Sequence, residues 1–424
     1  MLDKIIKLFK GKKDPYRWDV KKMLPRQESY EIVCPYCFSK FSHEDVLFRA
    51  ARYDNSAVET ALQTDPVLNK FWDMVGVDSA EIGDQNPVLD SATYPESAKN
   101  YDGSVIISLE DKFGNVSYDR ICPHCHNKLP KSAGRAPSNI ISVIGGTSVG
   151  KTVYIAMLID ILQKYTQNNF EASCMELSSG IGNLGDFDEL RRRILNDAHS
   201  ATDKEYIRPL VFRFAFLDNT IPALTLCFYD FPGEAMADQD FLKLKASHIA
   251  NASGVILLVD PLQCKVVAEK LGVEIIDNSI TLKHVLANLY QAVIGNQPDE
   301  ISTTPTAIVF TKSDELKALT NLENSPIRSN SNIFEDFKHP GYLDLDQTNN
   351  ISNDVMEFIQ NIEKSFINDV RAIFSNYHFF AVSSLGYSPI NAKVLVEPQP
   401  CRVDEPFLWL LYQLGYIKGR ERNV

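Results

Sequence analysis

The chain has 424 residues, of which 44% are hydrophobic and 23% charged, and its formal net charge is −12. This composition is typical of a globular protein and excludes the collagen-like, disordered and disulfide-dense classes. The acidic charge argues against broad binding to nucleic-acid phosphates, which depends on Lys and Arg. Because one core seldom grows beyond about 250–300 residues, we expect two or more packed units.

The chain lacks a run of about 18 apolar residues and the apolar core of a signal peptide, so we expect a cytoplasmic protein. The first residues, 1–15, read MLDKIIKLFKGKKDP and favour a basic amphipathic helix. Such a helix either binds peripherally to the inner face of the membrane or docks on its own domain with solvated lysines.

Two Cys-x-x-Cys pairs enclose a mixed insert, residues 38–121, within a module that we place at residues 28–130. Paired thiolates on tight turns are typical of tetrahedral Zn²⁺ sites. Four thiolates close the coordination shell, so we expect structural Zn²⁺ rather than a catalytic ion, with His124 and His126 as spare ligands. The predicted ligands are Cys34, Cys37, Cys122 and Cys125.

Residues 131–138 are rich in Pro, Ser, Gly and Ala and are expected to be a linker. Beyond them, apolar strand-like runs alternate with helical patterns, which predicts an α/β domain at residues 139–420 with a mostly parallel sheet. Insertions are expected at about 170–205 and 321–350. The expected strands are Ile140–Ile144, Leu210–Phe216, Ala223–Tyr229, Gly254–Val259, Thr306–Phe310 and His378–Val382. The expected helices include Lys151–Tyr165, Asp240–Ala250, Thr281–Val293, Asn353–Ser375 and Pro406–Leu414.

A phosphate-binding loop follows the first of these strands, because GGTSVGKT fits G-x-x-x-x-G-K-[ST] between a strand and a helix. Its backbone N–H groups and the positive end of the helix suit an anion. Lys151 is expected to reach the β- and γ-phosphates and Thr152 to ligate Mg²⁺. The predicted loop residues are Gly145, Gly146, Thr147, Ser148, Val149, Gly150, Lys151 and Thr152.

Three further strand ends supply the rest of the predicted site. Asp230 ends the strand LTLCFYD, where it can hold Mg²⁺ through a water, and Gly233 of D-x-x-G offers an N–H to the γ-phosphate. Asp314 of TKSD can accept hydrogen bonds from the guanine N1–H and amine, which adenine lacks. The expected base-binding residues are Thr311, Lys312, Asp314, Ser383, Ser384 and Leu385.

The ordered motifs GGTSVGKT, DFPGE, TKSD and SSLG resemble those of the TRAFAC-class P-loop GTPases, with TKSD in place of the usual N-K-x-D. The Cys-x-x-Cys module, DFPGE and VDEPFLWLLYQLG resemble bacterial double-GTPase proteins, which are often linked to conflict or defence systems. The resemblance covers residues 139–418 and the cysteine module. It implies GTP, Mg²⁺, and a protein partner or a second GTPase chain.

Two features of this chain depart from the usual GTPase pattern. Asp230 lies 79 residues after Lys151, so an enlarged switch region is expected between them, with Thr202 as the candidate switch threonine. Glu234 stands where related GTPases have Gln or His to orient water, and its charge beside a triphosphate predicts slow intrinsic hydrolysis. An arginine from a partner or a dimer is expected to accelerate it, and Arg191, Arg192 and Arg193 either act in cis or form a solvated helix face.

The sequence therefore predicts a GTPase that acts as a nucleotide-dependent switch, with Lys151, Thr202 and Glu234 as candidate catalytic residues. Two alternatives stay open. The chain is an ATPase if TKSD is only a turn at the end of a strand, or a GTP-gated scaffold with little hydrolysis. Nucleic-acid binding through the zinc module is disfavoured by the acidic charge.

Overall fold

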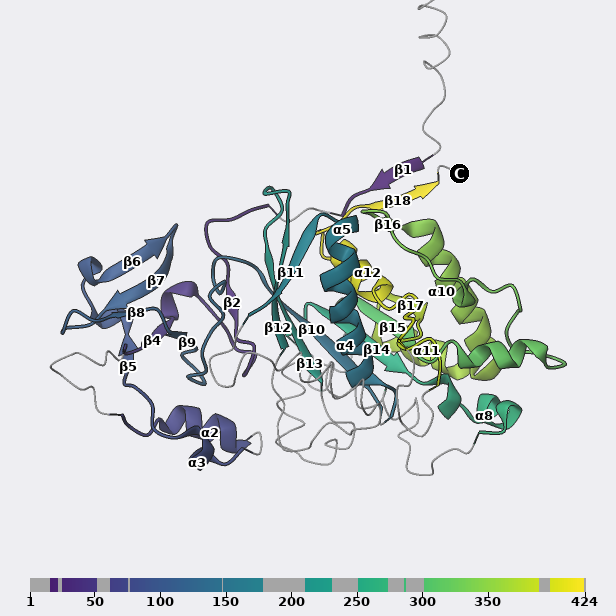
Figure 1. The fold of residues 1–424 in the computed structure, drawn as a ribbon, viewed down its shortest axis with the longest axis horizontal. Helices are drawn as coiled ribbons and strands as arrows, with labels where there is room; N and C mark the ends of the chain where they lie inside the picture. The colour runs from purple at the N-terminus through teal and green to yellow at the C-terminus, as the bar shows by residue number, and fades with distance from the viewer. Residues whose placement is uncertain are drawn as a thin grey trace, which may run out of the picture.

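The fold was examined in a computed structural model, which describes residues 16–21, 25–51, 62–74, 77–146, 148–177, 210–230, 251–273, 286, 301–388 and 397–422. A seven-stranded sheet lies at its centre (Figure 1), in the order β11–β12–β13–β10–β14–β15–β17. Its strands are β10 (Ser138–Gly145), β11 (Ala172–Glu176), β12 (Leu210–Phe216), β13 (Leu224–Asp230), β14 (Gly254–Val259), β15 (Thr306–Phe310) and β17 (Tyr377–Ala381).

Five neighbouring strands, β13–β10–β14–β15–β17, are parallel to one another, and β12 runs antiparallel to both β11 and β13. The predicted α/β class with a mostly parallel sheet is confirmed. The predicted strands agree with the observed ones to within two residues at each end, because buried parallel strands appear in the sequence as short continuous apolar runs. Strand β11 was not predicted and lies in the segment expected to be an insertion.

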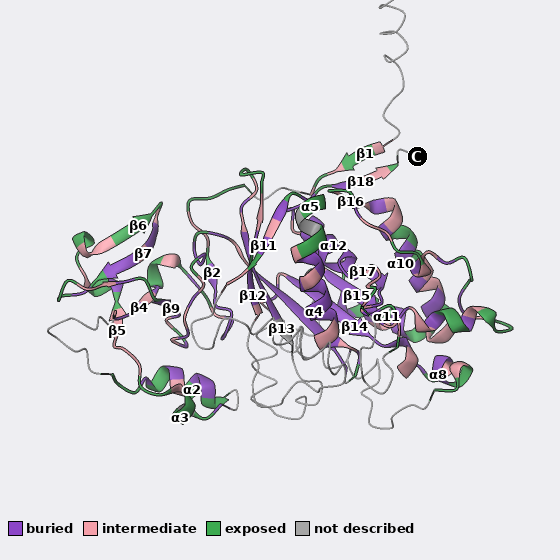
Figure 2. Cartoon of the chain, viewed as in Figure 1, coloured by how far each residue is buried: buried purple, intermediate pink, exposed green. Residues whose placement is uncertain are grey.

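Alternate residues of each central strand enter different cores, as the two-residue period of a strand requires. In β14, Ile256 and Leu258 pack with helices α4 and α12, whereas Val255, Leu257 and Val259 pack with α8, α10 and α11. Both faces of the sheet are therefore covered, and every residue of the central strands β14 and β15 is buried (Figure 2).

The helices of this domain are α4 (Lys151–Ile161), α5 (Gln167–Asn169), α8 (Lys265–Leu271), α10 (Leu345–Ile362), α11 (Lys364–Ile373) and α12 (Glu405–Gln413). Helix α10 begins earlier than the predicted Asn353, because Asp344 caps it by accepting a hydrogen bond from the N–H of Gln347 (3.0 Å). The Asn-rich sequence that follows had suggested a loop. The predicted helices Asp240–Ala250 and Thr281–Val293 lie outside the described residues, apart from Leu286.

The N-terminal module contains short elements, which lie to one side of the sheet in Figure 1. They are β2 (Ile32–Val33), β3 (Lys40–Phe41), β4 (Leu47–Arg49), α2 (Pro66–Met74), α3 (Ser79–Ile82), β5 (Val88–Asp90), β6 (Lys99–Asp102), β7 (Val105–Glu110), β8 (Val116–Ser117) and β9 (Arg120–Ile121). Its core surrounds Trp72, Phe48 and Leu109.

This module packs directly on the central sheet. Val33 and Phe38 form one buried cluster with Ile140 of β10, Val211 of β12 and Cys227 of β13. Their strand neighbours Ile141, Phe212 and Phe228 belong to the core under α4 and α12, so the module covers the opposite face of the sheet.

The segment expected to be a linker, residues 131–138, is also held in place. Ser132, Ala133 and Ala136 are buried, and the Ser132 and Thr225 hydroxyl groups lie 2.7 Å apart. Strand β10 already begins at Ser138. Contacts between the module and the sheet therefore include this segment as well as the buried cluster.

A second, small sheet brings the two ends of the described chain together. Strand β1 (Tyr16–Asp19) pairs antiparallel with β18 (Gly419–Arg422), which pairs with β16 (Leu343–Asp344). The Arg420 guanidinium lies over the rings of Tyr16, Trp18 and Tyr342. Residues 1–15, the expected amphipathic helix, lie outside the described part. Within that part, no helix is long and apolar enough to span a membrane.

Candidate functional site

The predicted nucleotide residues gather at one edge of the sheet. Strands β10, β13, β14, β15 and β17 are parallel, so their carboxyl ends lie together, and ligands of open parallel sheets bind at that edge. The edge carries the phosphate loop after β10, Asp230 at the end of β13, TKSD after β15 and Ser383 to Leu385 after β17.

The phosphate loop connects β10 to α4 with two constrained glycines. A Cβ at Gly145 would lie 2.7 Å from Val149 Cγ2 and 2.9 Å from the Leu258 carbonyl oxygen, so close packing against β14 requires glycine there. Gly150 caps α4 with φ of 86°, a left-handed conformation that glycine adopts most easily. The turn therefore depends on backbone geometry at both glycines, while Thr147 lies outside the described residues.

Lys151 is the first residue of α4 and is buried. Its Nζ donates hydrogen bonds to the carbonyl oxygens of Gly145 (3.2 Å) and Gly146 (2.8 Å). The ammonium group therefore lies inside the curve of the loop, beside the helix N-terminus, where an anion is favoured. Thr152, the next residue, is half-buried.

The TKSD segment and the loop after β17 contact each other directly. The Ser383 hydroxyl donates a hydrogen bond to Asp314 Oδ1 (2.5 Å) and accepts one from the Gly386 N–H (2.9 Å). Ser313 N–H donates to the Val382 carbonyl oxygen (3.1 Å). The Asp314 carboxylate is thus oriented by the neighbouring loop.

A third connection joins the TKSD segment to the phosphate loop. Lys312 Nζ forms an ion pair with Asp260 Oδ2 (2.7 Å) and donates to the Ser148 carbonyl oxygen (3.2 Å). Asp260 directly follows β14 and is buried, and its Oδ1 accepts from the Leu262 N–H (2.9 Å). Sequence reasoning missed Asp260, although its place after an apolar strand matches that of Asp230.

The loop after β17 is braced by a returning segment. Cys401 and Ser383 exchange two backbone hydrogen bonds, and Gln399 N–H donates to the Leu385 carbonyl oxygen (2.8 Å). Arg402, which follows Cys401, is buried and forms an ion pair with Glu405 Oε2 (3.0 Å). The other carboxylate oxygen of Glu405, Oε1, lies 3.4 Å from His339 Nε2. This buried ionic cluster, which the sequence did not reveal, anchors the brace.

Several predicted residues have no described position. Thr202, Gly233, Glu234 and the arginines 191–193 lie outside the described residues, and of Asp230 only the backbone is described, paired with Val143. Their roles stay predictions. The backbone of β13 does place Asp230 at the same sheet edge as the phosphate loop.

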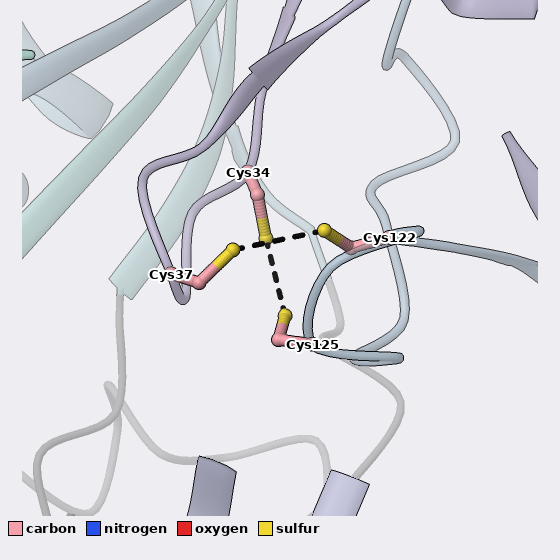
Figure 3. Close-up of side chains that lie close together, drawn as sticks. All are labelled: Cys34, Cys37, Cys122 and Cys125. Carbon is pink, nitrogen blue, oxygen red and sulfur yellow. Dashed lines mark hydrogen bonds between the residues drawn. The ribbon is translucent and has the colours of Figure 1, made fainter. Parts of the chain in front are cut away.

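The four predicted cysteines of the N-terminal module converge on one point (Figure 3). The Sγ atoms of Cys34 and Cys125 lie 3.7 Å apart, as do those of Cys37 and Cys122, and all four lie within 4.8 Å of one another. A tetrahedral Zn²⁺ with Zn–S bonds of about 2.3 Å places its sulfurs about 3.8 Å apart. The geometry therefore fits a Cys₄ zinc site.

Each cysteine pair lies on the same kind of turn. Phe38 N–H donates to the Cys34 carbonyl oxygen (3.1 Å), and His126 N–H donates to that of Cys122 (2.9 Å). Phe38 and His126 both have left-handed φ angles, 60° and 55°. Burial raises the pKa of the Cys34 and Cys125 thiols, so a cation is needed to hold these two groups as thiolates.

The two spare histidines make other contacts. His126 Nδ1 lies 2.9 Å from Asp65, whose carboxylate also pairs with Arg49 and accepts from the N–H groups of Val67 and Leu68 at the start of α2. His124 is exposed and packs edge-on against Phe41. Asp65 therefore connects the turn of Cys122 and Cys125 to the insert. The sequence alone did not explain how the insert returns the chain to the first cysteine pair.

Part of the chain matches a known protein family, and a longer part matches a curated relative. Residues 139–338 match the protein family described as Double-GTPase 2. A relative from Mycolicibacterium smegmatis, described as "Putative ESX-1 scaffolding and assembly protein SaeC", is 23% identical over 319 residues, which is 70% of this chain and 80% of the relative.

Two solved structures share low similarity with the chain. Methanosarcina barkeri Roco2 RocCORdC bound to GDP is 14% identical with a TM-score of 0.24, over 58% of this chain and 43% of that one. The S. cerevisiae Ski7 GTPase-like domain bound to GTP is 15% identical with a TM-score of 0.31, over 66% and 50%. This chain thus spans half or less of each, and the fold assignment rests on the sheet itself. Residues 139–338 are thus similar to the Double-GTPase 2 family, whose description implies a guanine nucleotide as ligand.

Proposed function

We propose that this chain binds GTP with Mg²⁺, hydrolyses it slowly and acts as a nucleotide-dependent switch. The observation that carries the proposal is the junction of two loops at the sheet edge. Lys312 contacts Ser148 of the phosphate loop, and two residues later Asp314 is oriented by Ser383. One ligand with an anionic end and a hydrogen-bonding base would reach both loops.

At the phosphate end, the backbone N–H groups of residues 145–150 and the N-terminus of α4 hold the phosphates. Lys151 leaves the carbonyl oxygens of Gly145 and Gly146 for the β- and γ-phosphates. Thr152 and Asp230 would hold Mg²⁺, which would neutralise charge on the phosphate oxygens.

At the base end, Asp314 accepts hydrogen bonds from the guanine N1–H and amine, while the Lys312 stem packs over the base. Thr311 ends β15 and Leu385 flanks the base edge beside Ser383 and Ser384. Adenine would leave the Asp314 carboxylate without its donors, and unpaired polar groups of this kind produce strong discrimination. The need of the Asp314 carboxylate for these donors favours a GTPase over an ATPase.

Hydrolysis is assigned to residues outside the described part. Thr202 would ligate Mg²⁺, the Gly233 N–H would donate to the γ-phosphate, and Glu234 would orient the attacking water. Because a carboxylate beside a triphosphate is electrostatically unfavourable, the intrinsic rate is low. An arginine supplied by a partner or a second GTPase chain would raise it by about 10³–10⁵.

The N-terminal module, residues 28–130, holds structural Zn²⁺ through its four cysteines and provides a binding surface. For residues 1–15 we propose either contact of their lysines with the inner face of the membrane or docking of the helix on the protein's own domain. The resemblance to double-GTPase proteins adds a setting in bacterial conflict or defence, which phage challenge of a deletion strain would test.

A second candidate is a GTP-gated scaffold that scarcely hydrolyses its nucleotide. The match to a relative described as a scaffolding and assembly protein favours it. Single-turnover hydrolysis with excess protein separates the two, because a scaffold releases no phosphate within minutes whereas a slow GTPase does.

The test of nucleotide binding is titration of fluorescent GTP with Mg²⁺ into wild type and Asp314→Ala, with ATP as competitor. Selective GTP binding that Asp314→Ala abolishes supports the proposal. If ATP competes as well as GTP and Asp314→Ala leaves GTP binding unchanged, the guanine assignment is wrong and the chain is an ATPase instead.

A further inference from the structure

A buried carboxylate links the two halves of the candidate nucleotide site. Asp260 is only 3% exposed and follows β14, which lies between the strands that carry the phosphate loop and TKSD. One carboxylate oxygen accepts from the Leu262 N–H at 2.9 Å, which fixes the side chain. The other lies 2.7 Å from Lys312 Nζ.

Lys312 carries this contact on to the phosphate loop. The same Nζ donates to the Ser148 carbonyl oxygen at 3.2 Å, so one ammonium group joins the residue after β14 to the phosphate loop. Lys312 and Ser148 both have left-handed φ angles, 54° and 60°. Such backbone conformations cost free energy and persist where surrounding contacts hold them.

The burial of Asp260 makes this contact specific. Its side chain is 4% exposed, so water screens its charge little, and a buried carboxylate without a partner is strongly unfavourable. Lys312 is 38% exposed and in the absence of Asp260 would gain hydration by turning outward. Thr311 does not share the task, because its hydroxyl donates back to the Val259 carbonyl oxygen at 3.3 Å.

We propose that Asp260 is a positioning residue for guanine-nucleotide binding, which rests on the function proposed above. Its carboxylate holds Lys312 against Ser148, so that the base loop and the phosphate loop keep one relative geometry before the nucleotide arrives. A preformed geometry saves the ordering cost that binding would otherwise include. Loss of Asp260 should therefore weaken binding of GDP and GTP alike and speed their dissociation.

The first test is Asp260→Asn, because the amide oxygen still accepts from the Leu262 N–H while the charge is lost. We expect fluorescent GDP to bind about tenfold more weakly, mainly through faster dissociation in stopped flow. The matched control is Asp218→Asn, in an exposed turn where Asp218 accepts from Thr220. It should leave both the affinity and the dissociation rate unchanged.

The decisive test is a double-mutant cycle of Asp260→Asn with Lys312→Met, read in GDP affinity. If Asp260 acts through Lys312, the double variant binds GDP no more weakly than Lys312→Met alone. Its GDP affinity then departs from the value expected for additive effects by about fivefold or more. A purely structural role would give additive effects. Should Asp260→Asn fail to fold, Asp260→Glu, which keeps the charge but moves it by one methylene, enters the same cycle.

The outcomes separate the two proposals. Failure of the wild type to bind GTP or GDP overturns the proposed function. Tight binding by the wild type, together with wild-type affinity in Asp260→Asn or additive effects in the cycle, overturns the role of Asp260 alone.

Discussion

Phe38 connects the zinc module to the sheet, and its removal should destabilise both. The side chain is fully buried among Val33, Ile140, Val211 and Cys227, so Phe38→Ala leaves a cavity between module and sheet. Buried Phe→Ala substitutions cost about 3–5 kcal/mol through lost transfer free energy and cavity formation. Ala adopts the left-handed φ of this position no more easily than Phe, so the backbone contributes little to the change.

The assay is urea denaturation of the zinc-loaded protein, combined with hydrogen exchange of peptides that cover β2 and β13. We expect a lower denaturation midpoint and faster exchange in both peptides, because the two strands share the cluster. The control is Phe113→Ala, which removes a half-exposed ring from the same module and should cost under about 1 kcal/mol. Equal midpoints for the two variants, or exchange that changes only in β2, would refute a shared core.

Three further predictions follow from the described contacts. Gly145→Ala should reduce GTP affinity more than tenfold in the fluorescence titration, because its Cβ meets Val149 and Leu258, whereas Gly272→Ala at the end of α8 should not. Cys122→Ser or chelation should abolish stoichiometric Zn²⁺ in elemental analysis and lower the melting temperature, whereas Cys264→Ser should retain the metal. Burial holds the pKa of His378 below its ordinary value, so the unfolded chain protonates first and stability falls as pH drops below about 6.5. His378→Gln should reduce the loss of melting temperature between pH 7.5 and 5.5.

For the first two of these, unchanged GTP affinity in Gly145→Ala, or full metal content in Cys122→Ser, would contradict the site geometry. For His378, the wild type and the Gln variant losing equal melting temperature would show that this imidazole does not contribute. The ring stacks on Trp409 and its Nε2 lies 3.0 Å from the Thr348 carbonyl oxygen, a contact that Gln can retain.

The strands and the motif residues were predictable because each depends on local pattern. Buried parallel strands such as β14 and β15 are continuous apolar runs, and strand ends carry the site residues by topology alone. Strand β11 was missed because it lies at the edge of the sheet, where Ser173 and Met175 interrupt the apolar pattern. Asp260 could have been found by the rule that identified Asp230.

Other features depend on contacts that no local pattern encodes. Pairing of β1 with β18 joins segments about 400 residues apart, and the Arg402–Glu405–His339 cluster joins a helix start to a loop. The docking of Phe38 on the sheet likewise depends on two modules meeting. The cysteine cluster was predictable despite its long insert, because two Cys-x-x-Cys turns specify one metal site wherever the chain between them runs.

The most direct test of guanine recognition is nucleotide selectivity of Asp314→Asn. Guanine offers two donors to the carboxylate, whereas xanthine has a carbonyl oxygen in place of the amine and therefore matches the Asn amide, which both donates and accepts. We predict that competition titration of the variant, with wild type as control, shows GTP weakened and xanthosine triphosphate strengthened. If Asp314→Asn keeps wild-type preference for GTP over xanthosine triphosphate, Asp314 does not read the base and the central claim is contradicted.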